Sequence, residues 1–436
     1  MKTTERREPA LSKVEGRESA GQHQASPELV ERGAAMKKGW QTKKLSDVCS
    51  IASALVDPRM TKYEDMLHVG GANIESATGK LVDLKTAKEE GLKSGKFVFD
   101  DSTVLYSKIR PYLMKVARPD FQGLCSADIY PLTPDPAVLD RGYLFHHLLS
   151  PQFTEFAVSG SARAGMPKVN RDHLFTFQFP VPPLAEQQRI VGLLDEAFEG
   201  LATAKANAEK NLQNARALFV RHLQSVFTQR GPGWVENKLK SITMKIGSGA
   251  TPRGGEESYK AEGISLIRSL NVHDLGFKYA KLAFLDDAQA DELSNVEVQP
   301  RDVLLNITGA SVARCAIVPE DVLPARVNQH VSIIRPIADK LDADFLHYLL
   351  ISKPYKDQLL KTGEEGGSTR QAITKAQIQE FTVEYPATLK EQKTIVAKLD
   401  AMLAETQRLA RLYERKQAAL EALKKSLLHQ AFTGAL

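Results

Sequence analysis

The segment LAEQQRIVGLLDEAF, Leu184–Phe198, recurs later in the chain as LKEQKTIVAKLDAML, Leu389–Leu403. The glutamate–glutamine, isoleucine–valine and leucine–aspartate pairs all coincide, at a constant separation of 205 positions. The match continues without a gap to the Phe-Thr pairs that begin at Phe227 and Phe432. A repeat of this kind indicates a duplicated structural unit. Because no insertion interrupts it, we predict two rigid elements of equal length.

Upstream of each copy the two halves match more loosely. Gly39-Trp40 corresponds to Gly233-Trp234, Val104-Leu105 to Val303-Leu304, and Tyr143-Leu144 to Phe345-Leu346. The sequence therefore divides into a tail, a globular domain, a helix, a second globular domain and a second helix. The predicted boundaries of these five parts are 1–36, 37–183, 184–232, 233–388 and 389–436.

Both repeated segments continue as long helices whose apolar residues recur at steps of three and four, the pattern of a coiled-coil seam. Up to its Phe-Thr pair, neither stretch contains an internal proline, and no glycine follows Gly200. About 40 residues at roughly 1.5 Å each give a rod of about 60 Å. We expect the two helices to pack on each other and to be antiparallel, since the second starts from the second domain and must return. Polar residues expected within the seams, fixing the register or marking a partner's face, are Lys205, Thr406, Gln417 and Lys424.

The globular domains are expected to mix strands and short helices. FVFDDSTVLYSKI, DIYPLTP, QPRDVLLNITGASVARCAIV and VSIIRPI have the β-branched, alternating content of strands. DRGYLFHHLLS and ADFLHYLLIS predict helices capped by Asp140, and by Asp342 or Asp344. FTFQFPVPPL and FTVEYPATL predict a closing strand in each domain. The predicted fold class is α+β: two mixed α/β domains separated by a long antiparallel two-helix coiled coil, as a pseudo-two-fold tandem repeat.

Composition narrows the class of protein. A net charge of +5 and a pI near 8.8 lean only weakly towards anionic partners. Three scattered cysteines exclude a disulfide framework and a CxxC zinc site, which favours a reducing compartment. No apolar run approaches the length needed to span a bilayer, and residues 1–36 lack a signal-peptide core, so we expect a cytoplasmic protein. The tail is expected to be disordered, unless translation begins at Met36.

Motifs for catalysis are missing from the sequence. There is no NPPY or DPPY tetrapeptide, no phosphate loop and no HExxH pair. GSGATPRGG lacks the GK[ST] that a nucleotide-binding loop needs. His146-His147 lies between Phe145 and Leu148, which favours packing inside the domain over a ligand role. We therefore predict a chain without a catalytic site or a metal site.

Three stretches of the chain resemble those of a known family. The junctions PPLAEQQRIV and ATLKEQKTIV and the terminus SLLHQAFTGAL resemble the specificity (S) subunit of type I restriction-modification systems, from about Met36 to Leu436. The sequence departs from the family pattern in two places. The second junction has Ala387-Thr388 where the first has Pro182-Pro183, and the N-terminal tail is longer than the family needs. The resemblance implies two target-recognition domains on double-stranded DNA, and association with two methyltransferase subunits and with restriction-translocase subunits. It also implies that S-adenosylmethionine, ATP and Mg²⁺ belong to those partners.

Candidate DNA-reading residues lie in the loops, because Arg pairs with guanine, Asn or Gln with adenine, and Lys with phosphate. Any single one of them has a competing interpretation as solvated surface. The first domain offers Lys108, Arg110, Tyr112, Arg163, Lys168, Asn170 and Arg171. The second offers Thr251, Arg253, Arg268, Asn271, Ser368, Thr369, Arg370 and Gln371.

Two unlike domains at the ends of a rod predict an asymmetric, bipartite DNA target whose half-sites lie about one helical turn, roughly 34 Å, apart. The helices would fix the spacer length without reading it. Three alternatives stay open from sequence alone. They are a DNA-binding protein without enzyme partners, a fragment of a fused restriction-methylation enzyme, and a helical scaffold that does not bind DNA.

Overall fold

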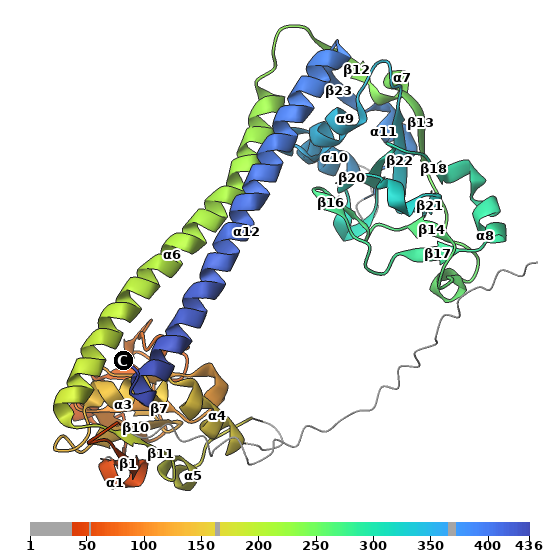
Figure 1. The fold of residues 1–436 in the computed structure, drawn as a ribbon. Helices are drawn as coiled ribbons and strands as arrows, with labels where there is room; N and C mark the ends of the chain where they lie inside the picture. Colours follow the sequence, from red (N-terminus) through yellow and green to blue (C-terminus); the bar gives the residue numbers. More distant parts are fainter. Residues whose placement is uncertain (1–36, 52–53, 162–165, 365–371) are drawn as a thin grey trace, which may run out of the picture. The chain divides into compact units, whose positions relative to one another are not determined.

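The computed structural model describes residues 37–51, 54–161, 166–364 and 372–436. The chain forms two compact units. The first contains the described residues up to Gly200 together with Ala422–Leu436, and the second contains Leu201–Glu421. Each unit therefore holds one globular domain, and two long helices contribute to both units (Figure 1). We call residues 37–183 the first domain and residues 233–388 the second domain.

The first domain contains two sheets and a short two-stranded pair. Its pair is β1 (Gln41–Lys44) with β11 (Gln178–Val181). One sheet has the order β2 (Cys49–Ser50), β10 (Ile129–Pro134), β7 (Val104–Ser107) and β8 (Val116–Ala117). The other has the order β3 (Leu55–Val56), β6 (Lys96–Phe99), β9 (Gly123–Ser126), β4 (Leu67–Val69) and β5 (Lys85–Thr86). The helices are α1 (Leu45–Val48), α2 (Thr61–Glu64), η2 (Pro111–Leu113), α3 (Arg141–Leu148), α4 (Pro151–Ser159) and α5 (Arg171–Phe175).

The second domain is built in the same way. Its pair is β12 (Trp234–Lys238) with β23 (Thr382–Pro386). Its sheets have the orders β13 (Thr243–Ser248), β22 (Val331–Pro336), β19 (Val303–Asn306), β20 (Cys315–Ile317), and β17 (Ala283–Leu285), β14 (Ile264–Ile267), β21 (Ala325–Val327), β18 (Glu297–Val298). A hairpin joins β15 (Val272–His273) to β16 (Gly276–Phe277). The helices are α7 (Leu239–Ile242), η3 (Gly255–Ser258), α8 (Asp287–Glu292), η4 (Ser294–Val296), η5 (Gly309–Ser311), η6 (Glu320–Val322), α9 (Ala343–Ile351), α10 (Lys353–Glu364) and α11 (Lys375–Glu380).

The two domains share one topology, which confirms the tandem repeat predicted from sequence. The sheet β2-β10-β7-β8 of the first domain has its counterpart in β13-β22-β19-β20 of the second. In the other sheet β9 pairs in parallel with β4, as β21 does with β14. The predicted strands appear as β6, β7, β10, β19, β20 and β22, and the closing strands as β11 and β23. Asp140 caps α3 by accepting from the Tyr143 N–H, and Asp342 caps α9.

The long helices are α6 (Leu184–Thr228) and α12 (Leu389–Thr433), each of 45 residues. Within the second unit they are antiparallel and lie side by side (Figure 1). Two ion pairs show the direction: Lys205 meets Glu421 at 2.6 Å, while Arg216, further along α6, meets Glu414 at 2.8 Å. The antiparallel coiled coil predicted from the spacing is therefore confirmed.

One polar seam residue was placed wrongly from sequence. The Lys205 side chain is 47% exposed and lies on the flank of the helix pair, where it reaches Glu421. The small apolar residues Ala208, Leu212 and Ala215 fill the seam of α6 instead. On the flank, the ammonium group of Lys205 stays hydrated while its methylene chain packs against the helix pair. This position therefore costs less free energy than burial in the seam. Thr406 does lie in the seam and is buried.

Each domain core also takes in the far end of the other domain's helix. In the first unit the Phe432 ring of α12 packs against Tyr143 at 5.3 Å and against His147 at 4.2 Å between centroids. In the second unit Phe227 of α6 packs edge-on to Phe345 at 5.5 Å. The repeated Phe-Thr pairs therefore fill equivalent positions in the two cores.

One buried glutamine joins the first domain to its helix. Gln187 has no exposed surface. Its Oε1 accepts from the Asp140 N–H at 2.7 Å, and its Nε2 donates to the carbonyls of Val138 at 2.9 Å and Pro182 at 2.7 Å. Both ends of the amide are satisfied by backbone groups, as a fully buried polar side chain requires. The start of α6 is thereby fixed to the loop that leads into α3.

The second domain repeats this junction with Gln392. Its Oε1 accepts from the Asp342 N–H at 2.8 Å, and its Nε2 donates to the carbonyls of Lys340 at 3.0 Å and Pro386 at 2.9 Å. The glutamine of the repeated Glu-Gln pair is thus a structural clamp between domain and helix. It aims each domain with respect to the helix that leaves it.

Candidate nucleic-acid interface

Two separate runs of candidate residues in the first domain come together in the structure. The backbone at Ile109 forms an antiparallel bridge with Lys168. The Val169 N–H donates to the Lys108 carbonyl, and the Arg110 N–H donates to the Pro167 carbonyl, both at 2.9 Å. Segments that are about sixty positions apart in the sequence therefore form one surface, which we call the first reading face.

An acidic residue that the sequence analysis missed holds this face together. Asp128, in the turn before β10, lies 3.5 Å from Lys108 and 3.6 Å from Lys168. Lys108 is the more enclosed of the two lysines, 12% exposed, and its Nζ lies 5.1 Å from the centre of the Tyr130 ring. Burial, followed by the positive charge of Lys168, lowers the pKa of Lys108. Lys168 is 40% exposed and is the better placed of the two to meet a phosphate.

The other candidates of the first domain differ in how far they are available. Arg110 and Arg171 are exposed, and the Arg171 guanidinium lies 5.5 Å from the centre of the Phe175 ring. Tyr112 is 52% exposed. Asn170 caps α5, because its Oδ1 accepts from the His173 N–H at 2.7 Å; only its amide nitrogen can turn outward. Arg163 lies outside the described residues.

The second reading face, around the start of η5, occupies the equivalent place in the second domain. There the backbone at Thr308 bridges Ala372, and the Ile373 N–H donates to the Ile307 carbonyl at 2.8 Å. This repeats the pairing that joins Ile109 to Lys168. The candidates Ser368, Thr369, Arg370 and Gln371 lie immediately before this pairing but outside the described residues.

A chain of hydrogen bonds crosses the second reading face. Thr251 bonds to Gln329, whose Nε2 lies 3.1 Å from His330 Nε2. His330 Nδ1 in turn lies 2.5 Å from the Thr308 hydroxyl. Thr251 was a candidate from sequence, whereas the other three residues were missed. His330 lies in the turn between β21 and β22 as Asp128 lies in the turn between β9 and β10, so aligning the repeats at these strands identifies both.

Two candidates in the second domain are used inside the fold. Arg268 is 12% exposed in its side chain, pairs with Glu256 at 2.6 Å and donates to the Lys281 carbonyl. Asn271 is fully buried, accepts from the Arg268 N–H and donates to the Lys278 carbonyl. In this conformation its amide has no surface with which to contact a base.

Asn73 in the first domain repeats the role of Asn271. Its Oδ1 accepts from the Gly70 N–H at 2.8 Å, and its Nδ2 donates to the Val82 carbonyl at 3.1 Å. Both asparagines therefore pin a turn of the shared framework, and Asn271 fits this structural role better than base readout. Arg253, by contrast, is exposed on the Gly-rich loop.

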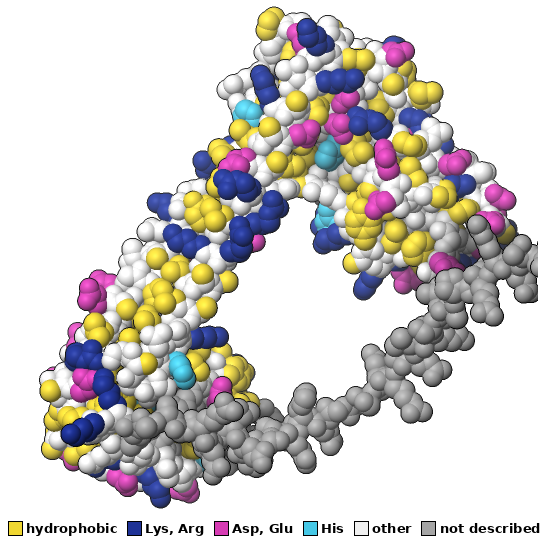
Figure 2. Space-filling model, in the orientation of Figure 1, with side chains coloured by type: hydrophobic (Ala, Val, Ile, Leu, Met, Phe, Trp, Pro, Cys, Tyr) yellow, Lys and Arg dark blue, Asp and Glu magenta, His cyan; other side chains and the backbone are white. Residues whose placement is uncertain are grey.

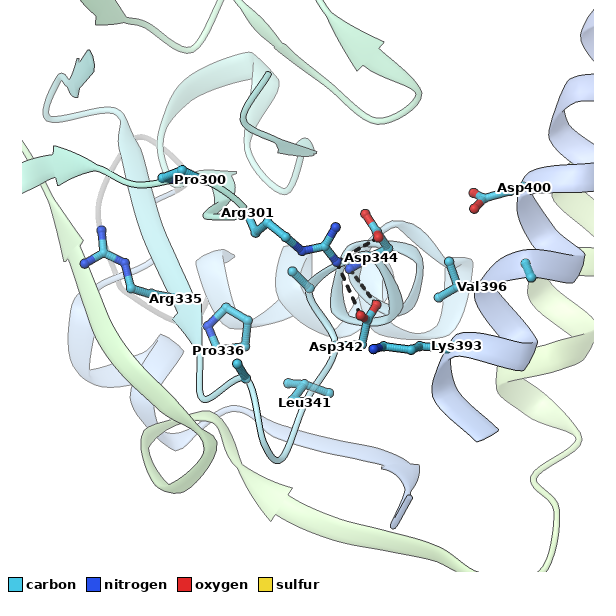
Figure 3. Close-up of a pocket in the computed structure, with 13 residues that line it drawn as sticks. Pro300, Arg301, Arg335, Pro336, Leu341, Asp342, Asp344, Lys393, Val396 and Asp400 are labelled. Atoms are coloured by element: carbon cyan, nitrogen blue, oxygen red, sulfur yellow. Dashed lines mark hydrogen bonds and ion pairs between the residues drawn. The ribbon is translucent and has the colours of Figure 1, made fainter. Parts of the chain in front are cut away.

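A hollow of about 810 Å³ lies where the second domain meets the first turns of α12 (Figure 3). Arg301 points into it and pairs with Asp342 at 3.3 Å and Asp344 at 2.8 Å. Asp400 of α12 accepts from the Tyr348 hydroxyl at 2.6 Å. The charges that line this hollow are thus largely neutralised by one another, which fits a domain–helix junction better than a ligand site.

The matching junction of the first domain uses different side chains around the equivalent aspartate. Asp195 accepts two hydrogen bonds from Arg118 and one from His146 Nε2, all at 2.7 Å. Burial alone would raise the pKa of Asp195, but the bonds from His146 and Arg118 bring it down to about 2. His147 is enclosed by aromatic rings, and burial lowers its pKa to about 3. Both histidines pack inside the domain, as the sequence predicted.

On the face of the second domain that Figure 2 shows, positive and negative charges are mixed. In the view of Figure 2 its Lys and Arg side chains are interspersed with Asp and Glu.

Across the described ranges, no group of three or more His, Cys, Asp and Glu side chains is arranged to hold a metal ion. Among the helices of those same ranges, none combines the length and the apolar character needed to cross a membrane.

The shared topology defines a protein with two recognition domains of one kind, each clamped to a long helix. The type I restriction modification DNA specificity domain matches the chain twice, over residues 37–212 and 233–417. The chain belongs to this family, which confirms the resemblance seen in the repeated junctions.

Two similar proteins are specificity subunits of type I restriction enzymes. The chain is 35% identical over 238 residues to the type I restriction enzyme EcoDI specificity subunit of Escherichia coli, covering 51% of this chain and 52% of that protein. It is 23% identical over 328 residues to the MjaVIII specificity subunit of Methanocaldococcus jannaschii, covering 72% of this chain and 74% of that protein. The matched region thus spans about half the length of the EcoDI relative.

Solved structures share the fold. A chain from a structure of the assembly and conformational transition of the type I R-M system has a TM-score of 0.74 and 24% identity, over 92% of this chain and 99% of its own length. The HsdS subunit from Thermoanaerobacter tengcongensis has a TM-score of 0.63 and 24% identity, over 94% of this chain and 100% of its own length.

Proposed function

We propose that this chain is the non-catalytic DNA specificity subunit of a type I restriction-modification complex. Residues 37–183 form a target-recognition domain for one half of a bipartite site, and residues 233–388 form the domain for the other half. The helical parts 184–232 and 389–436 set the number of base pairs between the halves. Residues 1–36 precede the first stretch that the family matches, and the complex works in the cytoplasm.

The observation that carries this proposal is that one framework presents two different sets of side chains at one place. The first reading face carries Lys108, Lys168 and Asp128, and the second carries Thr308 and His330. The four-stranded sheet that contains β7 or β19 and the glutamine clamp have the same arrangement in both domains. Two identical faces would favour a palindrome, as for a symmetric dimer. Two unlike faces favour an asymmetric site.

The long helices have the surface expected of a docking platform for two methyltransferase subunits. Leu218 and Val220 of α6 are 49% and 53% exposed, and Leu412 of α12 is 43% exposed. Figure 2 shows Lys and Arg side chains close to apolar ones along this part of the helices. Apolar side chains with a polar surround are typical of protein interfaces. Restriction-translocase subunits would then join, and S-adenosylmethionine, ATP and Mg²⁺ would be held by these partners.

The test is to produce the chain with a methyltransferase subunit encoded beside it, in cells without other DNA methylation, and to map methylated adenines. The proposal predicts co-purification of the two proteins and an asymmetric motif of two short blocks with an unread gap of constant length. Cells that produce either protein alone are the controls and should show no methylation. Methylation by this chain alone would support the fused-enzyme alternative. A single contiguous motif would contradict the two-domain proposal.

A further inference from the structure

The second reading face contains a polar hollow that the sequence analysis did not identify. It has a volume of about 390 Å³ and lies between η5 and the turn at Ser269 and Leu270. The side chains that give it polar character are those of Thr308, Ser311, Arg314 and His330. These groups come from two separate segments, and the turn at Ser269 and Leu270 adds a third. The hollow therefore depends on the tertiary fold and leaves no local motif in the sequence.

The hydrogen-bond chain determines in which direction the Thr308 hydroxyl donates its proton. The Thr251 hydroxyl donates to Gln329 Oε1, so the amide of Gln329 presents Nε2 to His330. An amide nitrogen is a donor only, so His330 Nε2 takes the acceptor role in this contact. The ring proton then sits on Nδ1 and is donated to Thr308 Oγ1. With its oxygen already accepting from His330, Thr308 can direct its own O–H proton into the hollow.

Arg314 supplies further donors. It lines the hollow, and no carboxylate of a described residue forms an ion pair with its guanidinium. Two other arginines of the domain are committed: Arg268 pairs with Glu256 at 2.6 Å, and Arg335 pairs with Asp302 at 2.7 Å. A guanidinium presents only donors, in a planar fork that matches two adjacent acceptors.

We propose that this hollow reads a guanine of the second half-site, with Arg314 as the principal base contact and Thr308 as a second donor. Guanine presents two adjacent acceptors, N7 and O6, in the major groove, whereas adenine presents an amino donor in place of O6. A site made of donors accepts the first pattern and opposes the second. His330, Gln329 and Thr251 act through Thr308 as positioning residues. This inference rests on the proposed function and deepens it, since it assigns one base to one domain.

The experiment compares methylation motifs of the wild-type complex with those of Arg314→Ala, Thr308→Val and Thr308→Ser. In the half-site that changes when residues 233–388 are exchanged, we expect one guanine whose preference falls roughly tenfold to a hundredfold in Arg314→Ala, the discrimination that a bidentate pair provides. Thr308→Val should relax the same position less, and Thr308→Ser, which keeps the hydroxyl, should retain it. The other half-site should stay unchanged. Thermal unfolding of each variant verifies that the domain is intact.

Lys353→Ala serves as the control, because it removes an exposed cation of the same domain, on α10, that pairs with Asp357 and does not line the hollow. It should leave the preference for guanine intact. Three results would overturn the inference: a wild-type half-site without guanine, an unchanged motif in Arg314→Ala, or a uniform loss of affinity with a weaker salt dependence, which indicates a phosphate contact. If the wild-type complex yields no motif at all, the proposed function itself fails and this inference with it.

Discussion

Replacing the buried clamp Gln187 by alanine should destabilise the first unit without unfolding the second. The substitution leaves the Asp140 N–H and the carbonyls of Val138 and Pro182 without their partner. At about 0.5–1.5 kcal/mol for each hydrogen bond, the three together contribute roughly 1.5–4.5 kcal/mol. For a unit of this size, a loss of about 3 kcal/mol lowers the melting temperature by roughly 6–12 °C.

The chain offers a clean assay, because its two tryptophans lie in different units: Trp40 in the first and Trp234 in the second. In a Trp234→Phe background, fluorescence during urea unfolding reports the first unit alone. The matched control is Gln188→Ala, which removes an exposed glutamine at the next position of the same helix. Equal stability of the Gln187→Ala and Gln188→Ala variants would refute the clamp.

Three further predictions follow the same contacts. The pKa of Asp195 is depressed to about 2, so the stability that its ionised form provides is fully present above the pKa of an unfolded aspartate, roughly 4, and is lost as the pH falls towards 2. Asp195→Asn should therefore remove this part of the acid sensitivity of unfolding, as followed by Trp40 fluorescence. An unaltered pH profile would count against the pairing. Phe432→Ala should cost the first unit about 3–5 kcal/mol while Phe227→Ala weakens the second, and the opposite assignment would contradict the shared cores. Lys168→Ala should weaken binding of the assembled complex to all DNA sequences alike and reduce the salt slope by about one; a change of motif instead would make Lys168 a base reader.

The sequence predicted the frame well, for a physical reason. An ungapped repeat over helices without internal proline constrains length directly, and α6 and α12 both contain 45 residues. Capping aspartates and alternating strands are local signals, so α3, α9, β7 and β19 were also predictable. Lys205 was misplaced because spacing alone does not distinguish a seam position from its flank.

The reading faces were predictable only in part. Loop position made Lys108 and Lys168 separate candidates, but their meeting at Asp128 depends on long-range strand pairing. Asn271 has the right chemistry for reading adenine, yet its amide is consumed by a turn. The hollow at Thr308 and Arg314 is assembled from three segments, and no local pattern signals it.

The most direct test of two independent reading domains on one frame is to replace residues 233–388 by the corresponding domain of the EcoDI specificity subunit and to map methylation with the chain's own methyltransferase partner. The account predicts that one block of the motif changes to a new sequence, while the other block and the length of the gap stay as they were. A change in both blocks, or a motif identical to that of the wild type, would contradict it.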